Sequence, residues 1–251
     1  MSTRQELKAQ GERIRAELGL PEDVHAEAVP GFSGMMDELC LGAIWGRPGL
    51  GMRERMIAVL CVLSARERHG VLRAYVGAGL RIGLEARTIQ EVFVHAGLYA
   101  GFVTSESALA IANEVFEAKG VTPAPLPEDT ADVDISQAGH DLMHALHGER
   151  SAEGYADPNH PTTGALYHLA IVYGYGALWN RPGLTRRERF ICAVATFATI
   201  DHHGQLAKFV ESGLAELSRD EIVEVLMQTA PYSGFPRALN ALTVAADVFA
   251  K

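Results

Sequence analysis

Two histidines stand at equivalent places in the chain and are the first candidates for proton transfer. His69 and His203 each follow an apolar run, precede a glycine, and are 134 residues apart. The imidazole pKa lies near neutrality, so such a histidine can exchange a proton with a bound substrate. It can instead cap the end of the preceding helix, where the helix dipole stabilises an imidazolium. Both interpretations stay open.

Two tyrosines form a second recurring pair. Tyr99 and Tyr232 each precede a glycine at a junction between two expected helices. A phenol there can donate a hydrogen bond to an oxyanion, or it can pack with its hydroxyl on a backbone carbonyl. His95 lies one helical turn before Tyr99, whereas Gln228 holds the equivalent place before Tyr232. This difference predicts that the two halves of the chain are chemically unequal.

Charged side chains recur in an Arg-Glu-Arg triplet. Glu54 and Glu188 are expected in the first turn of a buried helix, as a general acid or base or as salt-bridge partners of arginine. Arg55 and Arg189 can orient a substrate carboxylate through two parallel hydrogen bonds, or pair with the glutamates. Trp45 and Trp179, which precede these triplets, are added as substrate-binding candidates.

A metal site is not expected. His140, His144 and His147 share one helical face, but no glutamate completes a metalloprotease motif and the first half has no equivalent. A solvated helix face is the preferred interpretation. The sequence also contains no phosphate loop, nucleophile elbow or nucleotide fingerprint. We therefore expect a small-molecule substrate with no metal and no cofactor.

The sequence segments that position these residues occur twice in the chain. The hexapeptide Trp-Gly-Arg-Pro-Gly-Leu at 45–50 returns as Trp-Asn-Arg-Pro-Gly-Leu at 179–184, and Tyr-Ala-Gly-Phe at 99–102 returns as Tyr-Ser-Gly-Phe at 232–235. A period this long indicates a duplicated domain rather than a solenoid. We predict a first repeat at 1–120, a proline-rich linker at 121–135 and a second repeat at 136–251.

Helical patterns dominate both repeats, and no stretch has the alternation of a strand. Helices are expected at 4–18, 35–45, 54–65, 71–82 and 104–118, with a counterpart of the last at 238–250. Capping boxes at Thr88–Glu91 and Ser218–Glu221 are expected to open the helices that carry the two tyrosines. The predicted fold class is all-α.

Composition excludes further classes of function. The net charge of −9 argues against a nucleic-acid partner, which requires a basic surface. Cys40, Cys61 and Cys192 form no CxxC motif and are expected to be buried apolar residues. The N-terminus lacks the apolar core of a signal peptide, and the longest apolar runs are about half of what a bilayer requires. We expect a cytoplasmic protein without a membrane partner.

Together, the repeated Trp-x-Arg-Pro-Gly-Leu with Arg-x-Arg, the Tyr-x-Gly-Phe segment and Ala-Leu-Asn-Ala at 238–241 resemble the carboxymuconolactone decarboxylase family, a branch of the alkylhydroperoxidase D-like superfamily. The resemblance covers nearly all of both repeats. It implies an all-α fold of two tandem helical domains. It also implies a ring, which for a tandem chain would be a homotrimer of six repeats.

The chain differs from the family at the family's ionisable residues. The peroxidase branch carries a CxxC, but the corresponding stretches 64–69 and 198–203 contain no cysteine, which argues against peroxidase activity. The decarboxylase branch carries Glu-Leu-x-x-His, and those glutamate and histidine positions hold Val71 and Tyr75 in one repeat and Gln205 and Phe209 in the other.

Three functions follow. The first is decarboxylation of a small carboxylated lactone or keto acid without a cofactor. An arginine would hold a carboxylate, a tyrosine would stabilise the enolate, and His203, His69 or His95 would deliver the proton. The second is another proton-transfer reaction on a secondary metabolite, as an isomerase, cyclase or dehydratase. The third is a non-catalytic ligand-binding or structural ring.

Overall fold

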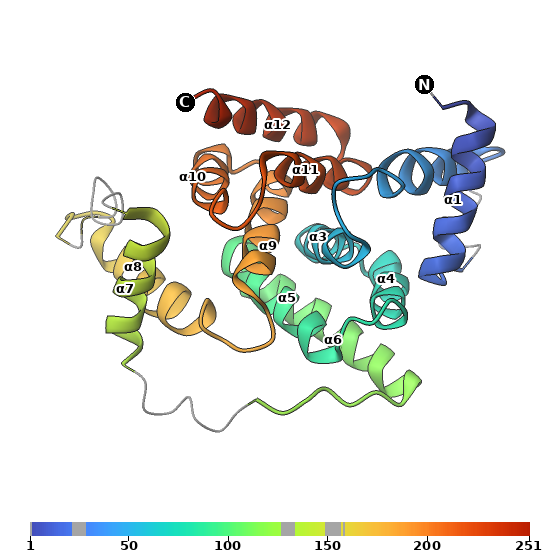
Figure 1. Ribbon diagram of the computed structural model, residues 1–251. Helices are drawn as coiled ribbons and strands as arrows, with labels where there is room; N and C mark the ends of the chain where they lie inside the picture. Colours follow the sequence, from blue (N-terminus) through green and yellow to red (C-terminus); the bar gives the residue numbers. More distant parts are fainter. Residues whose placement is uncertain (1, 22–28, 127–133, 149–156, 158) are drawn as a thin grey trace. The chain divides into compact units, whose positions relative to one another are not determined.

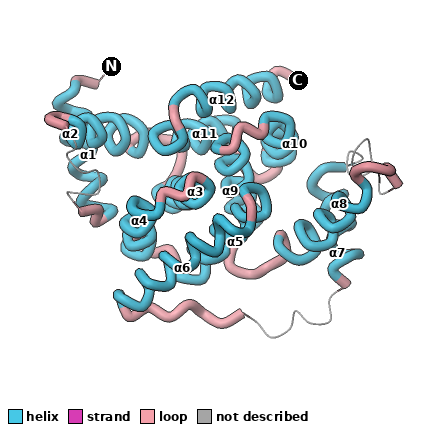
Figure 2. The backbone as a smooth tube through the Cα atoms, turned by 180° about the vertical axis from the view of Figure 1, so that it is seen from behind, coloured by secondary structure: helices cyan, strands magenta, loops and turns pink. Residues whose placement is uncertain are grey.

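The structure, a computed structural model, describes residues 2–21, 29–126, 134–148, 157 and 159–251. Every regular element in these ranges is a helix (Figures 1 and 2), which confirms the all-α prediction. None of the described helices is both long and apolar enough to cross a bilayer. The chain packs into two compact units, residues 1–124 with 185–251, and residues 125–184. The repeat boundaries predicted from the sequence stay a prediction.

The first unit contains most of the helices. They are α1 (Arg4–Leu18), α2 (Phe32–Met36), η2 (Asp37–Trp45), α3 (Met52–Ala65), α4 (His69–Arg81), α5 (Ala86–Ala100), α6 (Phe102–Lys119), α9 (Arg186–Thr199), α10 (His203–Gly213), α11 (Arg219–Ser233) and α12 (Phe235–Phe249). Helices α3 to α6 come from the first repeat and α9 to α12 from the second. One core is therefore built from both repeats.

Helices α3 and α9 form the centre of this unit, where they lie side by side (Figure 1). Every residue from Arg55 to Ser64 in α3, and from Glu188 to Thr199 in α9, is buried. Helices α11 and α12 lie on one side of the pair and α5 and α6 on the other (Figure 2). The burial confirms the prediction that the apolar run after each arginine triplet is a core helix.

Helices α1 and η2 pack through two glycines. A Cβ at Gly11 would collide with the carbonyl oxygen of Asp37, and a Cβ at Gly42 with that of Leu7. The two backbones are therefore in direct contact, which only a residue without a side chain permits. The helix predicted over 35–45 is present, but its main part, η2, is wound as a π-helix.

The second unit repeats this pairing. It contains α7 (Ile135–His147), α8 (Gly164–Leu169) and the π-helix η5 (Ala170–Leu178). A Cβ at Gly139 would collide with the carbonyl oxygen of Ile171, and a Cβ at Gly176 with that of Ile135. The same glycine contact thus recurs in the second repeat.

Helix starts show one confirmed and one wrong prediction. Ser218 caps α11 in a capping box with Glu221, as expected. The box expected at Thr88 is wrong, because α5 begins three residues earlier, with Glu85 as its N-cap, and Thr88 lies buried inside the helix. A capping box that was not predicted opens α9, where Thr185 pairs with Glu188.

Candidate active site

The two recurring histidines lie at the start of helices. His69 and His203 are the first residues of α4 and α10, after turns in which Glu67 and Asp201 have left-handed backbones. His69 is exposed, and His203 is partly exposed with its Nε2 3.8 Å from Asp201 Oδ1. Among the described residues, neither takes part in the arginine clusters described below.

The two glutamates join the repeats through ion pairs. Arg53 Nε donates to Glu188 Oε1 at 2.7 Å, and Arg187 Nε lies 3.6 Å from Glu54 Oε1. Each glutamate thus pairs with the arginine that precedes its counterpart in the other repeat. Glu188 also accepts from the Thr185 backbone and hydroxyl. Both glutamates therefore form the ion pairs that the salt-bridge interpretation expects.

Arg55 lies in the first of three polar clusters. This Arg55 cluster contains Arg55, Arg47, Glu224 and Gln228. The fully buried guanidinium of Arg55 donates to Glu224 Oε2 at 2.9 Å, to Gln228 Oε1 at 2.9 Å and to the Arg47 carbonyl at 2.8 Å. The backbone carbonyls of Pro48 and Leu50 accept further bonds. Arg55 therefore ties the Arg-Pro-Gly turn before α3 to helix α11.

Tyr232 lies in the second cluster, with Trp45, Tyr75 and Cys40. Its hydroxyl accepts from Trp45 Nε1 at 2.7 Å, and it lies 2.8 Å from the Tyr75 hydroxyl and 3.2 Å from Cys40 Sγ. Burial raises the pKa of both tyrosines well above 10 and that of the Cys40 thiol to about 11. All these groups stay protonated at neutral pH. The arrangement favours the packing interpretation of Tyr232, and Trp45 serves it as a donor.

The third cluster surrounds Arg189 at positions equivalent to Arg55, Glu224, Gln228 and Tyr232. This Arg189 cluster contains Arg189, Glu91, His95 and Tyr99. Arg189 Nη1 lies 3.3 Å from His95 Nδ1, and the rings of His95 and Tyr99 meet edge to face at 5.5 Å. Arg189, Glu91 and His95 are buried, whereas Tyr99 is only partly buried.

Aromatic rings surround Tyr99. Its ring lies 4.5 Å from that of Phe197 and 5.7 Å from that of Phe209. Phe209 stands where the first repeat has Tyr75, so the hydroxyl that faces Tyr232 has no equivalent beside Tyr99. Tyr99 and Tyr232 therefore occupy different chemical surroundings despite their equivalent positions.

The Arg189 guanidinium fixes the tautomer of His95. Burial, and secondly the Arg189 charge, hold the pKa of His95 well below 6.5, so the ring is neutral at pH 7. A guanidinium only donates hydrogen bonds, so Nδ1 must be the acceptor and the ring proton sits on Nε2. Burial also lowers the pKa of Arg189, which the Glu91 carboxylate opposes. The cluster thus contains a buried, neutral imidazole with an N–H donor.

The remaining candidates belong to the second unit. Trp179 is buried and stacks on Tyr175 with ring centroids 5.9 Å apart. His147 is buried with its Nε2 2.9 Å from the Tyr175 hydroxyl, so the solvated helix face expected for the three histidines is wrong at this position. His140 and His144 are exposed, as expected. No three His, Cys, Asp or Glu side chains in the described ranges converge in a way that suits a metal ion.

Glu91 and Glu224 are not among the predicted site residues. Each begins a series in which polar residues recur every four positions, as Glu91, His95 and Tyr99 and as Glu224, Gln228 and Tyr232. That spacing places the three side chains of a series on one helical face, and it is the signal that identifies the carboxylates.

Comparison with known proteins gives two findings. The sequence model of the carboxymuconolactone decarboxylase family matches residues 30–114 and again residues 165–247. The 4-carboxymuconolactone decarboxylase of Acinetobacter baylyi (strain ATCC 33305 / BD413 / ADP1) is 32% identical over 98 residues, which cover 39% of this chain and 73% of that protein. The two matched regions bear out the tandem arrangement.

Proposed function

The chain belongs to the carboxymuconolactone decarboxylase family, and from that premise we propose that it is an enzyme that removes CO₂ from a small carboxylated lactone or keto acid. The chemistry would be acid–base catalysis by the chain's own side chains. The observation that carries the proposal is the buried pair of Arg189 and His95. Peroxidase activity is not proposed, because the chain has no CxxC motif.

Each member of the Arg189 cluster has a role in this reaction. Arg189 would hold a substrate carboxylate, and the Tyr99 hydroxyl would donate to the oxygen that becomes negative as the C–C bond breaks. CO₂ leaves, and the bonding electrons remain on the substrate as an enolate. His95 would then transfer its Nε2 proton to the carbon that carried the carboxylate, and would regain a proton from water.

The Arg189 charge makes neutral His95 a better acid. A cation beside Nδ1 stabilises the imidazolate that forms when the Nε2 proton leaves. Burial strengthens this effect, because the interaction is weakly screened by solvent. Gln228 cannot act in this way, so we propose that the Arg189 cluster is catalytic and the Arg55 cluster is structural.

The test is the substitution His95→Gln, which installs the side chain that the other repeat has at position 228. With 4-carboxymuconolactone as the first substrate tried, we expect kcat for CO₂ release to fall by about 10²- to 10⁴-fold, the usual contribution of a general acid. The matched controls His69→Gln and His203→Gln remove histidines outside the cluster and should retain full activity. Full turnover by His95→Gln would rule out this assignment.

A second candidate is a different proton-transfer reaction on the same scaffold, such as isomerisation, cyclisation or dehydration. The observation that favours it is the replacement of the family's glutamate and histidine in both repeats, where Tyr75 and Phe209 are buried among aromatic rings. Product analysis separates the two candidates, since only decarboxylation releases CO₂. A non-catalytic ring predicts no turnover with any candidate acid.

We also propose that the chain assembles as a homotrimer, in which six repeats form the ring that the family resemblance implies. The proposal is supported by the two tandem matches to the family model.

A further inference from the structure

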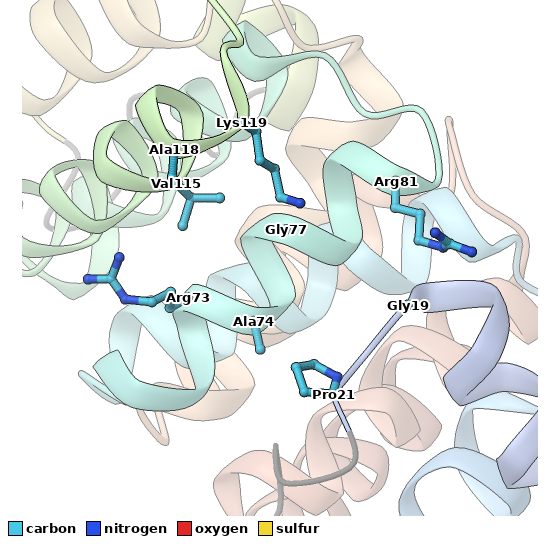
Figure 3. Close-up of a pocket in the computed structure, with 9 residues that line it drawn as sticks. All are labelled: Gly19, Pro21, Arg73, Ala74, Gly77, Arg81, Val115, Ala118 and Lys119. Carbon is cyan, nitrogen blue, oxygen red and sulfur yellow. The ribbon is translucent and has the colours of Figure 1, made fainter.

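A cavity is lined by helices α4 and α6 and by the segment that follows α1, and none of its lining residues belongs to the Arg189 cluster. Its volume is about 490 Å³, within the range of small-molecule sites. Figure 3 shows that α4 carries several of the lining residues, with Gly77 between Arg73 and Arg81. Lys119, at the end of α6, extends its side chain toward Gly77.

The lining combines three cations with a small apolar surface. Arg73, Arg81 and Lys119 supply the charges, and the other lining residues, which are small or apolar, are Gly19, Pro21, Ala74, Gly77, Val115 and Ala118. This concentration of positive charge occurs in a chain whose net charge is −9. A local reversal of charge attracts anions selectively from solution.

The three cations differ in how they are held. Arg81 Nε donates to the carbonyl of Glu17 at 3.1 Å, which fixes its guanidinium against the end of α1. Arg73 pairs with Glu114 at the surface, where an ion pair is weak and exchanges readily for another anion. Lys119 makes no hydrogen bond or ion pair within the described part of the chain, so its ammonium is available to a ligand.

Part of this charge has a structural explanation. Arg81 and Lys119 are the last residues of α4 and α6, where a cation offsets the negative end of the helix dipole. Arg73 lies in the first half of α4, where the helix dipole does not favour a cation. Gly77 lies inside the same helix, although glycine has a low helix propensity. The dipole therefore does not account for the whole arrangement.

The second repeat provides an internal comparison. The positions equivalent to Arg73, Gly77 and Arg81 hold Ala207, Glu211 and Ala215. A Cβ at Gly77 would come within 3.4 Å of Lys119 Cε, so the missing side chain is what leaves space beside the ammonium. The second repeat thus lacks both arginines and has an acidic side chain where the first repeat has that space.

We propose that this cavity binds a small organic carboxylate with a short apolar or aromatic body. The carboxylate would contact the Lys119 ammonium beside Gly77, with Arg73 and Arg81 adding positive potential from either side along α4. The apolar body would cover Gly77, Ala74 and Val115. Because the cations are exposed, binding should be weak and should decrease as salt screens the charges. The proposal does not depend on the proposed function, because the cavity shares no residue with the Arg189 cluster.

The experiment measures benzoate binding to the full-length protein by isothermal titration calorimetry at low ionic strength. We expect saturable binding by the wild type and at least a tenfold weaker affinity in Gly77→Glu, which copies Glu211 of the second repeat. Lys119→Ala should weaken binding severalfold. Benzamide, a neutral analogue of similar shape, should not bind measurably.

Controls separate this site from other effects. Gly77→Ala tests the change in helix propensity without adding charge, and Lys8→Ala removes an exposed lysine elsewhere on the same unit. Both should bind benzoate within twofold of wild type. Arg189→Gln removes the guanidinium proposed to hold the substrate carboxylate and should bind benzoate as well as wild type, which distinguishes this cavity from the Arg189 cluster. Absence of saturable binding to wild type, or equal affinity in Gly77→Glu, would overturn the proposal.

Discussion

At the scale of single residues, the buried guanidinium of Arg55 is predicted to be a major contributor to stability. Arg55→Met leaves the Glu224 carboxylate, which is largely buried, with the partly exposed Arg47 as its one remaining cation in the described part of the chain. Removing one partner of a buried pair costs about 3–5 kcal/mol of unfolding free energy. Urea denaturation of the variant measures this loss.

Two further variants serve as controls for this prediction. Arg47→Met removes the partly exposed partner of the same carboxylate and should cost about 1 kcal/mol or less. Arg55→Met combined with Glu224→Met should recover much of the loss, because no unpaired charge is then buried. An Arg55→Met protein within about 1 kcal/mol of wild type would contradict the structural role assigned to this cluster.

His95 is predicted to make stability depend on pH. Its pKa in the folded state lies well below 6.5, the ordinary value expected in the unfolded chain. Between these two values the unfolded state binds a proton that the folded state does not. Stability is therefore fully present above about pH 6.5 and decreases as pH falls below it, by up to about 1.4 kcal/mol per pH unit.

Denaturation of wild type and His95→Gln between pH 5 and 8 measures this dependence. The difference in unfolding free energy between the two proteins should be constant above about pH 6.5 and should shift in favour of the variant below it. His69→Gln, which changes an exposed histidine, should follow wild type throughout. Parallel curves for wild type and His95→Gln would show that His95 titrates normally.

The residue types of the candidate site could be predicted, but their partners could not. Arg55, Arg189 and the two tyrosines recur at fixed spacing, and the difference between His95 and Gln228 is visible in the sequence. The contact of Arg55 with Glu224 joins residues 169 positions apart. Such a pair depends on how α3 packs against α11, which no local pattern specifies. The same holds for Arg53 and Glu188.

At the scale of helices, the start of α3 is predicted to accept a stabilising cap. Gly51 and Thr185 are equivalent N-caps with nearly the same backbone angles, φ −72° and ψ 161° against φ −72° and ψ 164°. Only Thr185 has a side chain that can bond the third residue of its helix. Gly51→Ser should therefore complete a capping box with Glu54 and stabilise the fold by about 0.5 kcal/mol.

The matched control removes the existing cap at the equivalent position of α9. Thr185→Ala should lower the unfolding free energy by about 1 kcal/mol, because it removes the existing cap of α9. Both changes can be measured by urea denaturation. A decrease in stability for Gly51→Ser would mean that the Glu54 carboxylate, which a Cβ at position 51 would crowd, cannot move aside.

Helix positions were largely predictable from periodicity and from glycine and proline breaks. The expected 4–18 helix agrees with α1, and the Ser218 box opens α11. The Thr88 pattern misled because α5 already begins at Ala86, so Thr88 lies inside the helix and Glu91 is buried with Arg87 as its ion-pair partner. The π-winding of η2 was not predictable, because the apolar pattern of 35–45 is the same for an α-helix and a π-helix.

At the scale of the whole molecule, apolar side chains on the first unit are predicted to be covered by assembly. Phe102 and Val103 begin α6, and Phe235 and Leu239 lie at the start of α12, all 45% exposed or more. Exposed apolar groups of this kind mark protein interfaces. Light scattering coupled to size exclusion should give about three times the chain mass of 27.1 kDa.

Two substitutions test this surface. Val103→Glu and Leu239→Glu place charges on the apolar residues and should shift the protein toward smaller species. Lys8→Glu changes an exposed residue on α1 as a control and should leave the mass unchanged. A wild-type protein that remains at 27 kDa at micromolar concentration would refute the trimer.

The difference between His95 beside Arg189 and Gln228 beside Arg55 has a consequence for how the protein diverged. In an oligomer of identical one-domain subunits, one gene encodes every subunit. A substitution therefore changes the equivalent position in all subunits at once. Joining two copies in one gene removes that constraint. The position in one repeat can then hold a reactive side chain, as His95 does, while the equivalent position in the other repeat holds a structural one, as Gln228 does. A tight inhibitor of the reaction should accordingly titrate one equivalent per chain, half the number of duplicated domains.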